Sequence, residues 1–153
     1  NAQPLSPVAA VAHDGDFRVF QLGEPASVGL EVLAEGGDNA QFISEAAAET
    51  GVLTTVSGEA PIGPAGSETL RISVSEDAAD GLMLSIATML VNTNDAFTGI
   101  NAIGIGELAI DESVTRRSIA YDAGTEADSE AAGTIPGPAV GGEGFNELRD
   151  DTI

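Results

Sequence analysis

The feature that most constrains the fold is a near-continuous apolar run from Leu82 to Val91. It is bounded by the acidic turn Glu76–Gly81 and by the polar residues Asn92–Asp95. A membrane-spanning helix needs about 18 or more apolar residues, so we expect no transmembrane segment. The run suits a central strand covered on both faces, and a buried helix is the competing interpretation.

Short β patterns dominate the chain around this run. Extended or alternating segments are predicted at Leu5–His13, Val52–Val56, Leu70–Val74 and Ser113–Ala120. Two short helices are predicted, one over Ser27–Ala34 and one that Asp38 caps and Gly51 ends. The sequence therefore predicts a mainly β fold, an antiparallel β-sandwich with one or two short helices near the N-terminus.

The length of 153 residues fits one domain with a sizeable core, spanning residues 1–153. Hydrophobic residues make up 42% of the chain, which excludes wholesale disorder. Residues 123–153 are rich in glycine, proline and acidic residues. We expect this segment to be an irregular tail that needs an anchor, with Ile135, Val140 and Phe145 available to dock it.

The charge is strongly one-sided, because 25 acidic residues face five basic ones and the formal net charge is -20. Nucleic acids and anionic lipids are bound by neutralising phosphates with Lys and Arg, so we expect no nucleic-acid binding. The densest basic spot is Arg116-Arg117, but on the predicted strand these side chains point to opposite faces. High acidity without lysine is expected in high salt or in a calcium-rich exterior, and we favour a secreted or cell-surface protein.

Several enzyme classes are excluded by missing residues. The chain contains no lysine and no cysteine, which removes Schiff-base lysines, P-loop lysines, thiolate nucleophiles and cysteine metal sites. Neither Gly-x-Ser-x-Gly nor His-Glu-x-x-His occurs. The single histidine, His13, stands beside Asp14, and we interpret it as a hydrogen-bonded structural residue. We expect a protein that is not an enzyme.

The informative acidic residues lie where predicted strands end. Asp95 follows the apolar run, and Asp122 and Glu126 follow the last predicted strand with Gly124 between them. Calcium needs six to eight oxygen ligands, and the loops of a sandwich supply carboxylates, carbonyls and water. We predict one calcium ion bound by Asp95, Asp122 and Glu126. The alternative interpretation is that all three are solvated loop acids.

A set of short strings in this chain resembles the spondin domain family. They are Ser6-Pro7-Val8, His13-Asp14, Leu33-Ala34-Glu35-Gly36-Gly37-Asp38, Met89-Leu90-Val91-Asn92-Thr93-Asn94-Asp95, Tyr121-Asp122-Ala123-Gly124-Thr125-Glu126 and Ile135-Pro136-Gly137-Pro138. They run in order over almost the whole chain. The resemblance implies an extracellular antiparallel β-sandwich with bound calcium, its acidic ligands carried over to Asp95, Asp122 and Glu126.

The chain departs from animal members of this family at several positions. Phe97 and Tyr121 stand where those members tend to have tryptophan, Glu126 replaces an aspartate, and their cysteines are absent. The chain is more similar to the stand-alone secreted prokaryotic members.

Three functions follow as expectations. The first is a non-catalytic extracellular calcium-binding module for adhesion or for surface or matrix assembly, with a protein or surface partner or self-association. The second is a structural subunit of a surface filament, in which the arm Asn1–His13 adds as a strand to a neighbouring copy. The third is a glycosidase with a carboxylate pair, which the absence of tryptophan disfavours.

Overall fold

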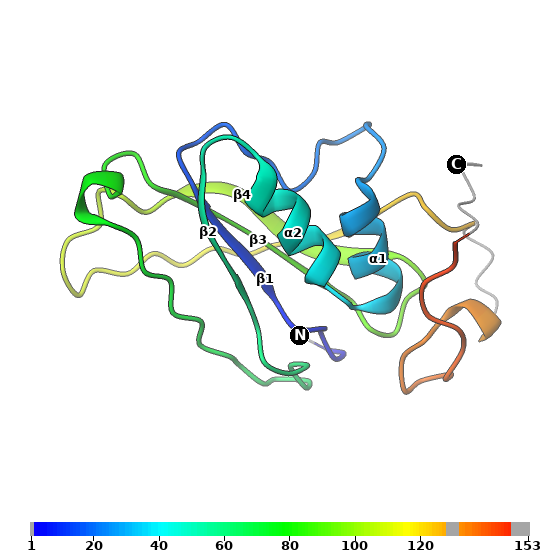
Figure 1. The fold of residues 1–153 in the computed structure, drawn as a ribbon. Coiled ribbons are helices and arrows are strands. Elements are labelled where there is room, and N and C mark those ends of the chain that lie inside the picture. Colours follow the sequence, from blue (N-terminus) through cyan, green and yellow to red (C-terminus); the bar gives the residue numbers. More distant parts are fainter. Residues whose placement is uncertain (1, 128–131, 148–153) are drawn as a thin grey trace.

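The fold was taken from a computed structural model, which describes residues 2–127 and 132–147 (Figure 1). The main elements are β1 (Ala9–His13), α1 (Val28–Gly36), α2 (Ala40–Ala48), β2 (Val52–Ser57), β3 (Met83–Met89), β4 (Ala96–Gly104) and β5 (Ala120–Asp122). Two short 3-10 turns lie at Glu76–Ala78 and Ala132–Thr134. The predicted mainly β class, with two short helices in the N-terminal part, is confirmed.

The strands form one antiparallel sheet in the order β2-β1-β3-β4-β5. The apolar run supplies β3, which lies in the middle of this sheet, so the strand interpretation is confirmed and the helix alternative is wrong. β1 pairs with β2 on one side and with β3 on the other. Leu5 adds isolated bridges to Ile62 and Leu90. The N-terminal arm therefore finds its pairing partners within its own chain.

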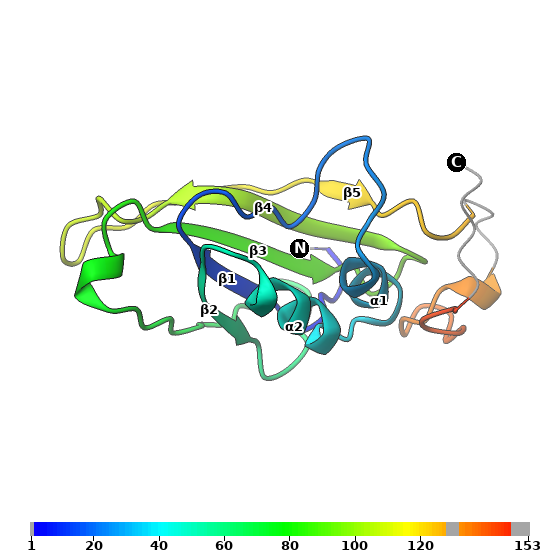
Figure 2. The same cartoon turned by 45° about the horizontal axis from the view of Figure 1, so that its top comes forward.

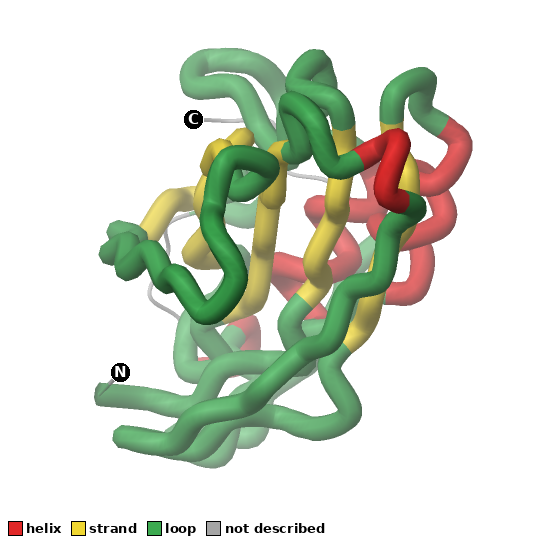
Figure 3. The backbone as a smooth tube through the Cα atoms, turned by 90° about the vertical axis from the view of Figure 1, so that its left-hand side faces the viewer, coloured by secondary structure: helices red, strands yellow, loops and turns green. Residues whose placement is uncertain are grey.

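Both helices lie on one face of the sheet (Figure 2). α1 packs over β3 and β4, while α2 packs over β1 and β2. The core between these layers is built from side chains that are almost fully buried, among them Val11, Leu30, Leu33, Phe42, Met89 and Phe97. The second sheet that a sandwich requires is not shown by the described residues, whose long connections 58–82 and 105–119 run largely as loops (Figure 3).

The ends of α1 follow the capping rules that the sequence predicts, whereas α2 ends at Ala48, with Glu49 as its C-cap, and not at the predicted Gly51. The Ser27 side chain accepts the N–H of Leu30 at 3.2 Å, and Gly37 ends α1 in the left-handed conformation at φ 73°. α2 begins one residue later than expected, with Asn39 at the cap position, while Asp38 accepts the N–H of Ala40. The two helices cross closely at Gly29, where an added Cβ would lie 2.5 Å from the Cα of Phe42.

Three predicted or missed strands show the limit of periodicity. Leu70–Val74 alternates between half-buried and exposed residues as predicted, but it joins no strand ladder among the described residues. Within Ser113–Ala120 only Ala120 lies in a strand, and both Arg116 and Arg117 are exposed. β4 was missed, because its apolar residues are separated by glycine and polar residues. Alternation reports a half-buried face, whereas a strand also needs a partner to accept its hydrogen bonds.

No helix in the described ranges 2–127 and 132–147 is long and apolar enough to cross a membrane.

Candidate metal centre

Asp95 lies in the turn between β3 and β4 and is 1% exposed. Its Oδ2 atom accepts the backbone N–H of Thr125 at 2.9 Å and that of Glu126 at 3.1 Å. Its own carbonyl accepts the N–H of Ala123 at 3.2 Å. Asp95 thus fixes the turn that follows β5, and this contact brings two of the three predicted ligands together.

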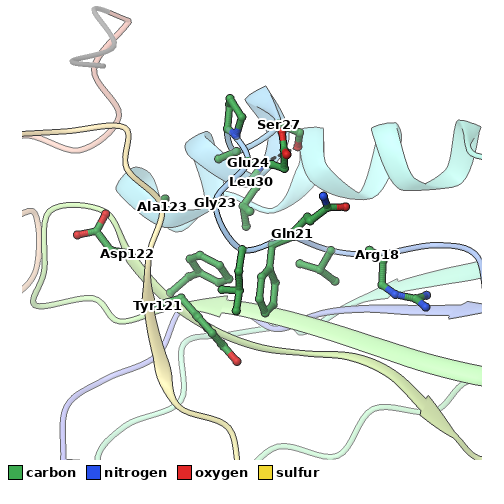
Figure 4. A pocket seen from close by; sticks show the side chains of 15 residues that line it. Arg18, Gln21, Gly23, Glu24, Ser27, Leu30, Tyr121, Asp122 and Ala123 are labelled. Carbon is green, nitrogen blue, oxygen red and sulfur yellow. Dashed lines mark hydrogen bonds between the residues drawn. The ribbon is translucent and has the colours of Figure 1, made fainter. Parts of the chain in front are cut away.

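Asp122, the last residue of β5, has an exposed side chain. Its Oδ1 atom accepts the N–H of Gly124 at 2.6 Å, which closes a tight turn that Gly124 enters at φ 66°. Figure 4 shows the Asp122 carboxylate pointing away from the aromatic side chain of Tyr121. The third predicted ligand therefore belongs to the same loop but faces solvent.

Glu126 is partly buried, and its Oε2 atom is buried without a hydrogen-bond partner among the described residues. Burial, and after it the negative charges of Glu35, Asp95 and Glu143 in that order, together raise the pKa of Glu126 to about 7. A carboxylate in these surroundings either holds a proton near neutral pH or needs a cation.

Glu35 is a further acidic residue of this region, and the sequence reasoning did not single it out as a ligand. It lies in the last turn of α1 and is 1% exposed. Its Oε2 atom accepts the N–H of Asn146 at 2.9 Å, while its Oε1 atom is buried without a hydrogen-bond partner among the described residues. The sequence feature that could have identified Glu35 is its position directly after Leu33-Ala34, on the apolar face of the predicted helix.

The C-terminal segment docks at the same end of the molecule, next to α1 and the β3–β4 turn (Figure 1). The N–H of Ala139 donates to the side chain of Asn92 at 3.2 Å, and Phe145 packs against Gly36. Val140 remains 46% exposed and Phe145 41% exposed. Docking therefore relies on polar backbone contacts at least as much as on the apolar side chains that were expected to provide it.

The donor set suits a hard cation in its chemistry, because it consists of carboxylate oxygens, two of them buried and unpartnered. Within the described part of the chain, however, no three acidic or histidine side chains converge closely enough to enclose a metal ion. Any ion bound here would need these side chains to move toward one another.

His13 has the structural role that the sequence suggested. It is fully buried, its Nδ1 atom accepts the N–H of Gly15 at 3.1 Å, and its Nε2 atom lies 2.9 Å from the Ser85 hydroxyl. Burial lowers the His13 pKa, and the positive charge of Arg18 lowers it further. The imidazole is thus held between the loop that follows β1 and the neighbouring strand β3.

Comparison with known proteins supports the resemblance seen in the sequence. A search of curated proteins found no match. The family model described as Spondin_N matches residues 1–135, which includes both helices, all five strands and the acidic residues Glu35, Asp95, Asp122 and Glu126. The chain belongs to the spondin N-terminal domain family.

Proposed function

We propose that this chain is a non-catalytic, extracellular calcium-binding module used in adhesion or in surface or matrix assembly. Membership of the spondin N-terminal domain family points to an extracellular module of non-enzymatic character. Calcium is proposed to bind at Asp95, Asp122 and Glu126, with Glu35 as an additional carboxylate beside them.

One observation carries the metal proposal, which is the pair of buried carboxylate oxygens without partners on Glu35 and Glu126. Leaving a buried carboxylate oxygen unpaired is costly, and placing two carboxylates in mutual repulsion adds to that cost. A divalent cation would satisfy both oxygens and neutralise the repulsion that raises the pKa of Glu126. A proton on Glu126 could relieve only part of this charge.

The four acidic residues would contribute to calcium binding in different ways. Glu35 and Glu126 would supply the unpartnered oxygens, whereas Asp95 already uses one oxygen to hold the loop that carries Glu126. Asp122 would join by turning its exposed side chain. Bound calcium would supply charge neutralisation and a link between α1, the β3–β4 turn and the loop after β5.

The experiment is calcium titration by calorimetry on protein freed of metal with a chelator. We expect one saturable site with a dissociation constant of about 10⁻⁴ to 10⁻³ M, as in other extracellular modules. Magnesium should bind more weakly, because it loses its water shell reluctantly and demands octahedral geometry. Glu126→Gln should abolish or strongly weaken the heat, while Glu107→Gln, at an exposed turn, should leave it unchanged. Absence of saturable calcium binding in the wild type would refute the proposal.

A further inference from the structure

A shallow groove of about 670 Å³ lies at the side of the molecule opposite β2, between the segment 18–22 and the segment 117–121. Its floor is formed by residues 99–101 of β4. Figure 2 shows the loop that leads to α1 beside β5, where these segments meet. The loop is fastened there because Asn101 accepts the N–H of Val19 at 2.7 Å and donates to the carbonyl of Phe20 at 3.0 Å.

The groove gathers positive charge in a chain that is otherwise strongly acidic. Arg18 and Arg117 both line it, out of five arginines in a chain of net charge -20. The Arg18 guanidinium is held in place by donating to the carbonyls of Gly15 and Phe17. Arg117 is exposed, and within the described ranges its side chain makes no hydrogen bond or ion pair. A guanidinium group without an internal partner can bind a carboxylate of another molecule.

The groove also carries exposed apolar side chains. Leu22 is 75% exposed and Ile119 is 66% exposed, and both line it. A neighbouring pocket of about 320 Å³ shares Arg18, Leu22 and Tyr121 with the groove. It is lined by the buried side chains of Leu30 and Phe97 and also by Glu24 and Asp122 (Figure 4). Tyr121 stacks on Phe97 with ring centroids 5.5 Å apart, so one wall of this pocket is aromatic. Exposed apolar groups beside a concave pocket with apolar and a few polar side chains are typical of a binding surface.

We propose that the groove and its neighbouring pocket bind an extended peptide segment of a partner protein. In this arrangement an acidic side chain of the peptide pairs with Arg117 and Arg18, and a large apolar side chain enters the pocket beside Tyr121. Charge complementarity selects a carboxylate, because the groove is basic while the net charge of the chain repels long polyanions. The exposed Leu22 and Ile119 select a peptide over an acidic polysaccharide, since a sugar chain has no comparable apolar side chains. This inference goes beyond the proposed calcium site, which the neighbouring pocket meets only at Asp122, whose carboxylate points away from Tyr121.

The test uses a fluorescein-labelled eight-residue peptide that alternates aspartate with leucine, measured by fluorescence anisotropy with the wild-type protein. We expect saturable binding with a dissociation constant on the order of 10–100 µM, as for a small, weak interface. A peptide with lysine in place of aspartate and one with serine in place of leucine should each bind at least about tenfold more weakly. Absence of saturable binding, or equal binding of the lysine peptide, would overturn the proposal.

Matched variants locate the site. Arg117→Gln should weaken binding about three- to tenfold, whereas Arg116→Gln, which changes the net charge equally at a neighbouring exposed residue outside the groove, should leave it unchanged. Leu22→Ser should weaken it about five- to tenfold, and Ile110→Ser, at a residue 96% exposed elsewhere, should not. Equal effects within either pair would show that peptide binding depends only on net charge or on nonspecific hydrophobic contact, and the proposal would fail.

Two further measurements separate this proposal from its competitors. Binding should be the same in calcium and in chelator, so loss of the calcium site would leave it intact and a failure here would leave the calcium proposal intact. An oligouronate of similar length should compete poorly with the peptide. If the oligouronate displaces the peptide at lower concentration than unlabelled peptide does, the assignment to a peptide partner is wrong.

Discussion

The Oδ2 atom of Asp95 accepts the backbone N–H of Glu126 at 3.1 Å, joining the start of β4 to the loop after β5. The same oxygen accepts the N–H of Thr125. A single buried carboxylate therefore positions the residue whose own carboxylate is the most strongly perturbed of the region. This gives Asp95 a structural role that is present before any cation binds.

Asp95→Ala should destabilise the metal-free protein by about 2–4 kcal/mol, because it leaves two buried backbone donors without their charged acceptor. Asp95→Asn should cost less, since its amide oxygen can still accept. Urea denaturation in chelator measures both, with the exposed Glu107→Gln as the control. If Asp95→Ala were as stable as that control, the loop would not depend on Asp95.

The raised pKa of Glu126 should make the stability of the metal-free protein depend on pH. Its pKa is about 7 in the folded protein against 4.5 ordinarily, so between these values the folded state binds more protons than the unfolded state. The contribution of Glu126 to stability is therefore complete below about pH 4.5 and is lost as the pH rises through about 7.

Glu126→Gln should remove this loss, giving a metal-free protein that is more stable than wild type at pH 8. Thermal unfolding in chelator at several pH values measures the difference. The exposed Glu107→Gln should keep the wild-type profile. A wild-type profile in Glu126→Gln would show that another group causes the pH dependence.

Calcium should raise the melting temperature, because an ion that binds only the folded state adds about 2.7 kcal/mol at 100 times its dissociation constant. For a domain of this size the shift is on the order of 5–10 °C. Differential scanning fluorimetry in calcium, magnesium and chelator at constant ionic strength measures it. Equal melting temperatures in calcium and chelator would contradict a calcium site.

Glu35 links the proposed ion to the C-terminal segment, since its Oε2 atom accepts the N–H of Asn146. Removing calcium should therefore loosen the segment 132–147 before the sheet unfolds. A protease specific for glutamate should cut at the exposed Glu143 faster in chelator than in calcium. The Glu35→Gln variant should be cut at the faster rate both in calcium and in chelator. A calcium effect that persists in this variant would argue against a link between the ion and the C-terminal segment through Glu35.

Gly29 tests the packing of the two helices independently of the site. An added Cβ would lie 2.5 Å from the Cα of Phe42, so Gly29→Ala must push α1 and α2 apart. We expect a loss of about 1–3 kcal/mol in urea denaturation. Gly63→Ala, where nothing lies within 4 Å of the added Cβ, should be nearly neutral.

Local chemistry determined the parts of the fold that the sequence predicted well. Ser27 and Gly37 mark the ends of α1 because capping satisfies backbone groups within a few residues. The run Leu82–Val91 supplied β3 because its length and apolar side chains suit a strand that lies between two neighbours in the middle of a sheet. Asp95 and Glu126 were predicted to meet because each follows the end of a predicted strand and the spondin resemblance assigns both to one site; the Asp95 carboxylate does accept the backbone N–H of Glu126.

Tertiary structure alone decided the rest. Leu70–Val74 has the alternation of a strand but lacks a partner ladder among the described residues, whereas β4 has a poor pattern and pairs with β3 throughout its buried part. Glu35 joins the acidic region only because α1 ends against the loop after β5 and the C-terminal segment. Strand pairing and the meeting of charges distant in sequence depend on which surfaces pack together, and the sequence by itself determines only which residues are able to do so.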